Sequence, residues 1–207
     1  MSVESRPNKV AAVVLAAGRS SRFGSNKLLH KVLGRTVLEW SLDPVLASGF
    51  WEVAVVIPQK SEMKKLIPAG VKAVVNENSK DGIGTSIAKG AGCFEKEADG
   101  ILFLLGDQPL LRKRDIGMFL AAFSSNPRSI IACYSEGEIR NPILFPSGFF
   151  GELKRLKGDR GARDMARLHP ERLVKIEIDI AHLVDIDTKN DILALEKGLE
   201  VKFHEDR

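Results

Sequence analysis

Short continuous runs of apolar residues alternate along the chain with longer amphipathic stretches. The apolar runs are rich in Val, Ile and Leu and predict strands that are buried on both faces. They are expected at 10–16, 52–58, 71–75, 101–106, 129–134 and 173–178. The amphipathic stretches predict helices at 36–49, 61–67, 85–97, 112–123 and within 184–198. The first helix should break or kink near Pro44 and end at Gly49.

This alternation of strands and helices predicts a parallel sheet with helices on both faces, joined by right-handed crossovers. The sequence has no internal repeat, no low-complexity segment and no linker, so a single three-layer α/β domain over residues 1–207 is expected. The least regular parts of the second half are the segments IRNPILFP (139–146) and LKGDRGARDMARL (156–168).

Composition narrows the class of protein. The net charge of +4 comes from scattered basic residues, and only 6% of residues are aromatic, which argues against a stacking surface for nucleic acid. Cys93 and Cys133 form no CxxC pair and are expected to be reduced core thiols. The chain starts without a signal-like segment, and the apolar stretch 10–17 is far shorter than the roughly 20 residues that cross a bilayer. We therefore expect a soluble cytoplasmic protein with no membrane partner.

The loop LAAGRSSRFGSNK (15–27) follows the first strand with several glycine, serine and basic residues. In open α/β sheets ligands bind beyond the carboxyl ends of strands. The loop matches neither GxxxxGK[ST] nor GxGxxG. Gly18 could still bring backbone N–H groups close to a phosphate, and Arg22 and Lys27 could neutralise it. A solvated turn with incidental charges is the alternative interpretation.

Two acidic segments point to a cation. Asp107 ends the most apolar strand, where it could also act as a helix N-cap or a turn former. In VDIDT (184–188) Asp185 and Asp187 should share one face of a strand, although Asp187 could merely cap the last helix. Separated carboxylates suit Mg²⁺, which keeps waters and bridges phosphates. With the basic loop, they predict a nucleoside triphosphate site.

A set of short segments resembles the MobA-like nucleotidyltransferase family, and within it the molybdenum cofactor cytidylyltransferases. These segments are LAAGRSSRFGSNKLL, DGIGTSIAKG, GDQPLL, RNPILFP, KGDRGAR and VDIDTKNDI, in the order of the family and spread from about residue 10 to 195. The resemblance implies a mostly parallel, Rossmann-like α/β/α sheet of the nucleotidyltransferase (GT-A-like) type. It further implies a nucleotide-binding part at about 8–110 and an acceptor-binding part at about 111–200.

The resemblance also implies roles for individual residues. Catalysis would rest on Lys27, Arg22 and Asp107. Metal, Mg²⁺ or Mn²⁺, would be held by Asp107 and Asp187, with Asp185 behind them. The acceptor would contact Gln108, Asn141 and Arg163. The nucleotide would lie against Leu15, Ala16, Ala17, Gly18, Arg22, Lys27, Asn76, Gly82, Gly84, Ser86 and Asp107.

The implied reaction is transfer of CMP from CTP to the phosphate of molybdopterin, with release of pyrophosphate. An ionised phosphate nucleophile needs no general base, and the four histidines are isolated in sequence, where surface or capping roles are expected. The expected partners are these small molecules and a molybdenum enzyme or its chaperone, but no nucleic acid. The alternatives are a guanylyltransferase using GTP, a nucleotidyltransferase acting on a sugar or small-alcohol phosphate, and a non-catalytic nucleotide-binding adaptor that delivers the cofactor.

Overall fold

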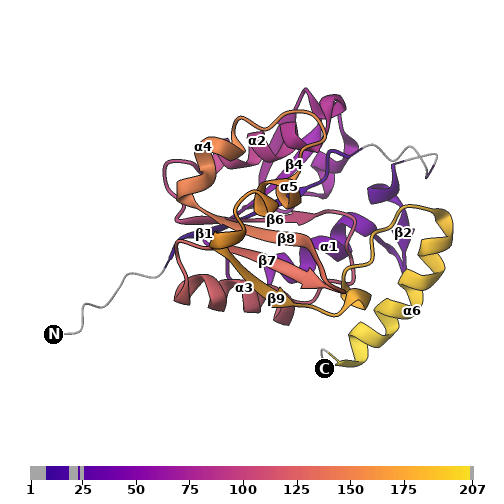
Figure 1. Ribbon diagram of the computed structural model, residues 1–207. Helices are drawn as coiled ribbons and strands as arrows, with labels where there is room; N and C mark the ends of the chain where they lie inside the picture. The colour runs from indigo at the N-terminus through magenta and orange to yellow at the C-terminus, as the bar shows by residue number, and fades with distance from the viewer. Residues whose placement is uncertain (1–7, 19–22, 24–25, 206–207) are drawn as a thin grey trace.

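The computed structural model describes residues 8–18, 23 and 26–205, and its centre is a seven-stranded sheet (Figure 1). The strand order is β5-β4-β1-β6-β8-β7-β9, and β8 alone runs antiparallel to its neighbours β6 and β7. The strands are β1 (Val10–Leu15), β4 (Glu52–Pro58), β5 (Lys72–Asn76), β6 (Gly100–Leu105), β7 (Ile130–Ser135), β8 (Glu138–Pro146) and β9 (Leu173–Glu177). A small separate hairpin joins β2 (Lys31–Val32) and β3 (Arg35–Thr36).

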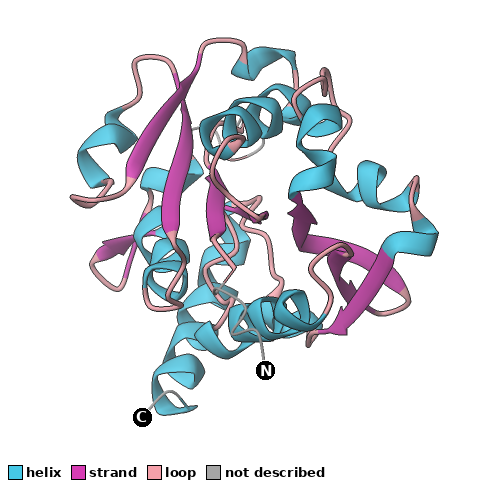
Figure 2. Ribbon diagram, turned by 90° about the vertical axis from the view of Figure 1, so that its left-hand side faces the viewer, coloured by secondary structure: helices cyan, strands magenta, loops and turns pink. Residues whose placement is uncertain are grey.

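Helices cover both faces of this sheet, which confirms the predicted three layers (Figure 2). One face packs against α1 (Val37–Leu46) and α3 (Lys113–Ser125), and α6 (Lys189–Glu205), which lies beside β2, adds Leu195 and Leu199 to the same core. The other packs against α2 (Ile83–Phe94), α4 (Phe150–Leu153) and α5 (Ala162–Arg167). Short 3-10 helices are η1 (Lys27–Leu29), η2 (Glu62–Leu66), η3 (Ser79–Asp81), η4 (Ser147–Phe149), η5 (Pro170–Arg172) and η6 (Ile180–His182). Within the described part of the chain, no helix is long and apolar enough to span a membrane.

The buried strands explain why the layers form. In β1, Val10, Ala12 and Val14 pack into the core beneath α1 and α3, whereas Ala11 and Val13 pack into the core beneath α2. Every residue of β1 is buried, so its apolar run has no polar alternation. Gly90 lets α2 lie close to β1, because a Cβ there would stand 2.5 Å from Cγ1 of Val13.

The second half departs from the sequence-based expectation in two places. Residues 139–146, predicted to be irregular, form most of β8, and residues 162–167 of the other irregular segment form α5. The Asn141–Pro142 pair hid the strand, because a proline removes a ladder donor. The structure accommodates it with a bulge: Ala132 pairs with Ile143 but Cys133 pairs with Arg140, which leaves Asn141 and Pro142 outside the ladder.

Two local predictions were also wrong. The first helix does not break at Pro44, since α1 continues through it to Leu46, after an N-terminal capping box between Thr36 and Glu39; a kink at Pro44 stays a prediction. Residues 184–187 belong to no strand. Their alternation survives nevertheless, because Ile186 is buried while Asp185 and Asp187 are not.

Candidate functional site

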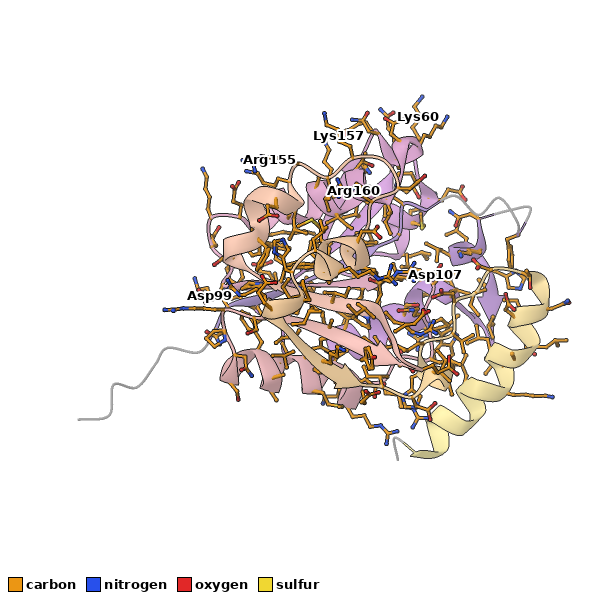
Figure 3. All side chains as sticks on the ribbon, viewed as in Figure 1. Lys60, Asp99, Asp107, Arg155, Lys157 and Arg160 are labelled. Carbon is orange, nitrogen blue, oxygen red and sulfur yellow. The ribbon has the colours of Figure 1, made fainter. Side chains whose placement is uncertain are left out.

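The carboxyl ends of β1 and β6, neighbours in the sheet, open into a cavity of about 570 Å³. The Gly106 N–H donates to the Leu15 carbonyl at 3.0 Å, so the chain segments that follow the two strands leave the sheet side by side. The cavity is lined by Leu15, Ala17, Gly18, Lys27, Leu28, Ser79, Lys80, Asp81, Gly82, Ile83, Ser86, Leu105, Asp107 and Asp159. Figure 3 labels Asp107 at this end of the sheet. This is the position at which open α/β sheets bind ligands.

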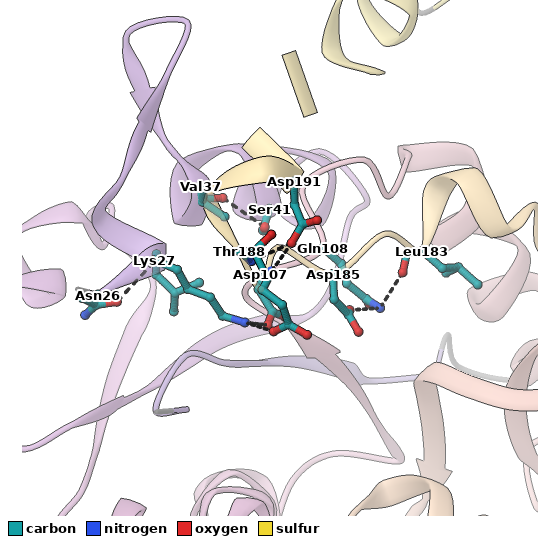
Figure 4. A network of polar contacts seen from close by, with 12 residues as sticks. Asn26, Lys27, Val37, Ser41, Asp107, Gln108, Leu183, Asp185, Thr188 and Asp191 are labelled. Carbon is teal, nitrogen blue, oxygen red and sulfur yellow. Dashed lines mark hydrogen bonds and ion pairs between the residues drawn. The ribbon is translucent and has the colours of Figure 1, made fainter. Parts of the chain in front are cut away.

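Lys27 connects two of the predicted metal-binding carboxylates. Its Nζ lies 2.7 Å from Oδ2 of Asp107 (Figure 4). The same Nζ lies 2.8 Å from Oδ1 of Asp187. The side chains of Lys27 and Asp107 are 13% and 20% exposed, and that of Asp187 is 49% exposed. Burial lowers the pKa of Lys27, but the charges and hydrogen bonds of Asp107 and Asp187 outweigh burial and raise that pKa above its ordinary value. Lys27 is therefore fully protonated near neutral pH.

The structure separates the capping role from the carboxylate of Asp187. Asp191 caps α6, because its carboxylate accepts from the N–H groups of Asp187 (2.9 Å) and Thr188 (2.6 Å). The Ile186 N–H donates to the carbonyl of Asp107 at 3.1 Å, which holds this segment against the end of β6. The carboxylate of Asp187 is thereby directed toward Lys27.

Asp107 likewise does not cap a helix. The next helix, α3, begins at Lys113, and its first turn is capped by Asp115, whose Oδ2 accepts from the Arg112 N–H at 2.9 Å. Asp107 lies in the turn between β6 and that helix and faces the cavity. Its carboxylate is thus available to a ligand or a cation as well as to Lys27.

Asp185 is held by Gln108 rather than by Lys27. The Gln108 Nε2 donates to Oδ1 of Asp185 at 2.9 Å and to the Leu183 carbonyl at 3.4 Å. Part of the Asp185 side chain remains exposed, yet desolvation by the surrounding protein, followed by the negative charge of Asp107, raises the pKa of Asp185 to about 6. Gln108 is buried, and within the described part of the chain its Oε1 has no hydrogen-bond partner.

The opposite wall is built from glycine backbone. Gly82 has φ +103° and ψ 168°, a conformation that essentially only glycine adopts. A Cβ on Gly82 would stand 2.2 Å from the carbonyl carbon and oxygen of Gly158, and the Gly84 N–H donates to that carbonyl at 2.9 Å. The loop around Gly158 therefore crosses directly over the start of α2, and it brings Asp159 to the cavity.

Asn76 lies behind this wall rather than on it. Its side chain is fully buried, and Nδ2 donates to the hydroxyl oxygens of Thr85 and Ser86, both at 2.9 Å. Its Oδ1 accepts from the Asn78 N–H at 3.0 Å. Asn76 thus positions Ser86, which does line the cavity, and the prediction of direct nucleotide contact by Asn76 stays a prediction.

Among the described residues predicted to contact the nucleotide, Ala16, Asn76 and Gly84 do not line the cavity. Those that do are Leu15, Ala17, Gly18, Lys27, Gly82, Ser86 and Asp107. Ala16 is buried at the end of β1, where its N–H donates to the Val56 carbonyl at 2.8 Å. Asn141 lies in the β8 bulge beside the end of β6, and Arg163 is exposed on α5; neither lines the cavity. Arg22 lies outside the described residues.

Sequence reasoning missed several cavity residues and misjudged one histidine. Ser79, Lys80 and Asp81 line the cavity from η3, although the resemblance implied nucleotide contacts only at Asn76 and from Gly82 onward in this part of the chain. His182, expected on the surface or at a cap, is buried instead, with Nδ1 3.0 Å from Oδ2 of Asp115. No histidine is among the described residues that line the cavity.

The donor set fits a divalent cation that arrives with phosphates. Residues 8–18, 23 and 26–205 contain no group of three or more His, Cys, Asp or Glu side chains arranged to hold a metal ion. Asp107 and Asp187 nevertheless converge on one point, the Nζ of Lys27. One or two carboxylates completed by substrate phosphates and waters is the usual set of ligands for Mg²⁺.

Residues 12–174 match the family described as MobA-like NTP transferase domain. The chain is 33% identical to the Purine catabolism protein PucB of Bacillus subtilis, over 85% of this chain and 90% of that protein. It is 27% identical to a probable molybdenum cofactor guanylyltransferase of Thermococcus sibiricus, over 91% of this chain and 98% of that protein. The fold matches a nucleotidyl transferase from Methanothermobacter with a TM-score of 0.80 at 24% identity, covering 94% of this chain and 99% of that one.

Proposed function

The chain belongs to the family of MobA-like NTP transferase domains, and from this we propose that it transfers the CMP group of CTP to the terminal phosphate of molybdopterin. A nucleotidyltransferase activity is the property of the family; the nucleotide and the acceptor are the proposal. The observation that carries it is the convergence of Asp107 and Asp187 on Lys27, because Lys27 and Asp107 line the same cavity as Gly18. In this proposal residues of about 8–110 bind the nucleotide and residues of about 111–200 bind the acceptor.

The proposed step is an in-line displacement at phosphorus. A phosphate oxygen of the acceptor forms a bond to the α-phosphorus of CTP, while the bond to the bridging oxygen breaks and pyrophosphate leaves with that electron pair. The acceptor phosphate is already ionised near neutral pH, so the step needs no general base. The absence of histidine among the described residues that line the cavity agrees with this.

The residues of the cavity divide the remaining tasks. The backbone of Ala17 and Gly18 would lie along the phosphates, and Lys27 would neutralise the charge that builds on the leaving pyrophosphate. Asp107 and Asp187 would hold Mg²⁺ or Mn²⁺, with Asp185 behind them. A bound divalent cation supplies electrostatic neutralisation of the phosphates.

Binding of the two organic groups is proposed at opposite sides of these carboxylates. The wall of Gly82, Gly84 and Ser86 would contact the nucleotide base and ribose. Asn141 of β8 and Arg163 of α5 would contact the acceptor, together with Gln108 beyond the end of β6. The reaction is proposed to occur in the cytoplasm, with the product passed to a molybdenum enzyme or its chaperone.

A GTP-dependent reaction is the second candidate, because one relative is named as a probable molybdenum cofactor guanylyltransferase. The deciding experiment measures pyrophosphate release by the purified protein with Mg²⁺, molybdenum-loaded molybdopterin and CTP, GTP or ATP in turn. Release with CTP is the expected result. Preference for GTP would replace the cytidylyl proposal by the guanylyl one, and nucleotide binding with no release would exclude this acceptor.

A further inference from the structure

The point on which Asp107 and Asp187 converge is occupied by the ammonium group of Lys27. The two oxygen contacts of 2.7 and 2.8 Å are the lengths of strong, charge-assisted hydrogen bonds. Lys27 is therefore bound here as a cation by both carboxylates, at the same place that the proposed function assigns to a divalent metal ion.

The two cations cannot share this arrangement. Mg²⁺ requires carboxylate oxygens at about 2.0–2.1 Å, closer than those around Nζ, so an ion bound by both carboxylates would stand at or beside the nitrogen position. The like charges would also repel strongly, because Lys27 and Asp107 are only slightly exposed and water screens them weakly. Binding of the metal thus requires the ammonium group to leave.

The ammonium group of Lys27 can reach a second position, inside the cavity. It lies at the start of η1, whose backbone is fixed by Asn26: the Leu28 N–H donates to Oδ1 of Asn26 at 3.2 Å. Lys27 also lines the cavity, together with Gly18 and Lys80. Rotation about the bonds of its flexible stem can turn the ammonium group from the carboxylates to an anion in the cavity while the backbone stays in place.

We propose that Lys27 and a divalent cation are alternative occupants of the space between Asp107 and Asp187, exchanged by the nucleotide. This inference rests on the proposed function in one respect, that the anion in the cavity is a nucleoside triphosphate. The phosphates attract Lys27 out of the carboxylate pair and at the same time provide the remaining metal ligands. The metal should accordingly bind tightly only together with the nucleotide.

The test measures Mn²⁺ binding by electron paramagnetic resonance, with and without the unreactive analogue α,β-methylene-CTP. Without nucleotide, K27M should bind Mn²⁺ at least about tenfold more tightly than the unmodified protein, because a competing positive charge is gone. K31M removes the same charge from an exposed side chain four residues further along and should bind Mn²⁺ as the unmodified protein does. The analogue should tighten Mn²⁺ binding at least about tenfold in the unmodified protein and clearly less in K27M.

An unchanged or weaker affinity of K27M for Mn²⁺ without nucleotide would overturn the proposal. Because K27M leaves two carboxylates close together, its fold is checked by circular dichroism, and Mn²⁺ should raise its melting temperature more than that of the unmodified protein. K27R keeps the positive charge and should retain the weak metal binding.

These measurements involve no acceptor and no turnover, so they separate the two proposals. Competition between Lys27 and Mn²⁺ without pyrophosphate release would leave this inference standing and reject the proposed acceptor reaction. Pyrophosphate release with no change of metal affinity in K27M would support the proposed reaction and reject the exchange between Lys27 and the metal ion.

Discussion

The two walls of the cavity are held in place by different kinds of interaction. On one side, Lys27 joins Asp107 and Asp187 through ionic contacts between side chains that lie 160 residues apart at the extremes. On the other side, Gly82 and Gly84 meet the backbone of Gly158 through close packing and one backbone hydrogen bond. The first wall, Lys27 with Asp107 and Asp187, depends on charge and is called the ionic wall. The second, Gly82 and Gly84 against Gly158, depends on close approach of backbone atoms and is called the glycine wall.

This difference predicts how each wall responds to substitution. An amide of the same shape can replace Asp107 without a change in packing, and Lys27 then keeps its contact with Asp187, so the rate of nucleotidyl transfer should fall much more than the stability. A glycine in close contact with another backbone has no room for even one methyl group. Its replacement should therefore lower the free energy of unfolding more than it changes the reaction. Four predictions test the contrast, in decreasing order of expected effect.

Asp107→Asn should lower the rate of nucleotidyl transfer by about 1,000-fold, which corresponds to ~4 kcal/mol in the barrier. Steady-state kinetics and thermal denaturation measure the two sides of the prediction, and the melting temperature should stay close to that of the unmodified protein. Asp43→Asn, which removes the same charge from a pair with Arg35, is the control and should keep full activity. Retained activity in Asp107→Asn would remove this carboxylate from the mechanism.

Gly82→Ala should destabilise the protein by about 3 kcal/mol, because its φ of +103° is unfavourable for alanine and the new methyl group collides with Gly158. Urea denaturation measures this change. Gly137→Ala is the matched control, since φ is +81° there but nothing lies within 4 Å of the added Cβ. It should lose only about 1 kcal/mol. Equal losses would mean that backbone strain alone explains both.

Asn76→Ala should lower stability by about 2 kcal/mol, because Thr85, Ser86 and the Asn78 N–H lose a buried partner. It should also raise the KM for the nucleotide a few-fold while leaving kcat nearly unchanged, since Ser86 shifts but the carboxylates do not. Asn126→Ala removes an exposed amide with one hydrogen bond, to Ala122, and should cost much less. A large fall in kcat would instead indicate direct contact of Asn76 with the reacting groups.

The residues of the ionic wall could be singled out from the sequence, although their ion pairs could not, and the reason is local. β1 and β6 are continuous apolar runs, so their carboxyl ends, and the polar residues that follow, are easy to locate. Asp107 lies two residues beyond β6, Lys27 begins η1 in the connection that follows β1, and the resemblance supplied their roles. The choice between a capping and a binding role for Asp187 needed the structure, because it depends on Asp191 taking over the cap.

The glycine wall and the second half of the sheet could not be predicted in the same way. The contact of Gly82 with Gly158 joins segments that are far apart in the sequence, and nothing in either segment alone indicates it. β8 was missed because Asn141 and Pro142 interrupt its apolar pattern, and only pairing with β6 and β7 makes the strand. Both features arise from tertiary packing, which overrides local preference.

The smallest predicted effect concerns Asp185. It tests whether the carboxylates of Asp107 and Asp187 in the ionic wall disfavour the ionised form of Asp185. In protein freed of divalent metals by a chelator, carbon-13 NMR should show the Asp185 carboxyl titrating at about pH 6. Because this pKa is raised above the unfolded value of about 4, the folded protein keeps a proton that the unfolded chain releases between these pH values. The stability from this group is therefore present below pH 4 and is lost as the pH rises to 6.

Asp185→Asn should then gain stability relative to the unmodified protein as the pH rises from 4 to 7, measured by urea denaturation at each pH. The gain arises because an uncharged amide keeps the contact with Gln108 without adding a negative charge beside Asp107 and Asp187. A constant difference across that range would show that Asp185 ionises as an ordinary carboxyl group. In that case Asp107 and Asp187 would not repel the carboxylate of Asp185, and only the contacts of Lys27 would distinguish the ionic wall from the glycine wall.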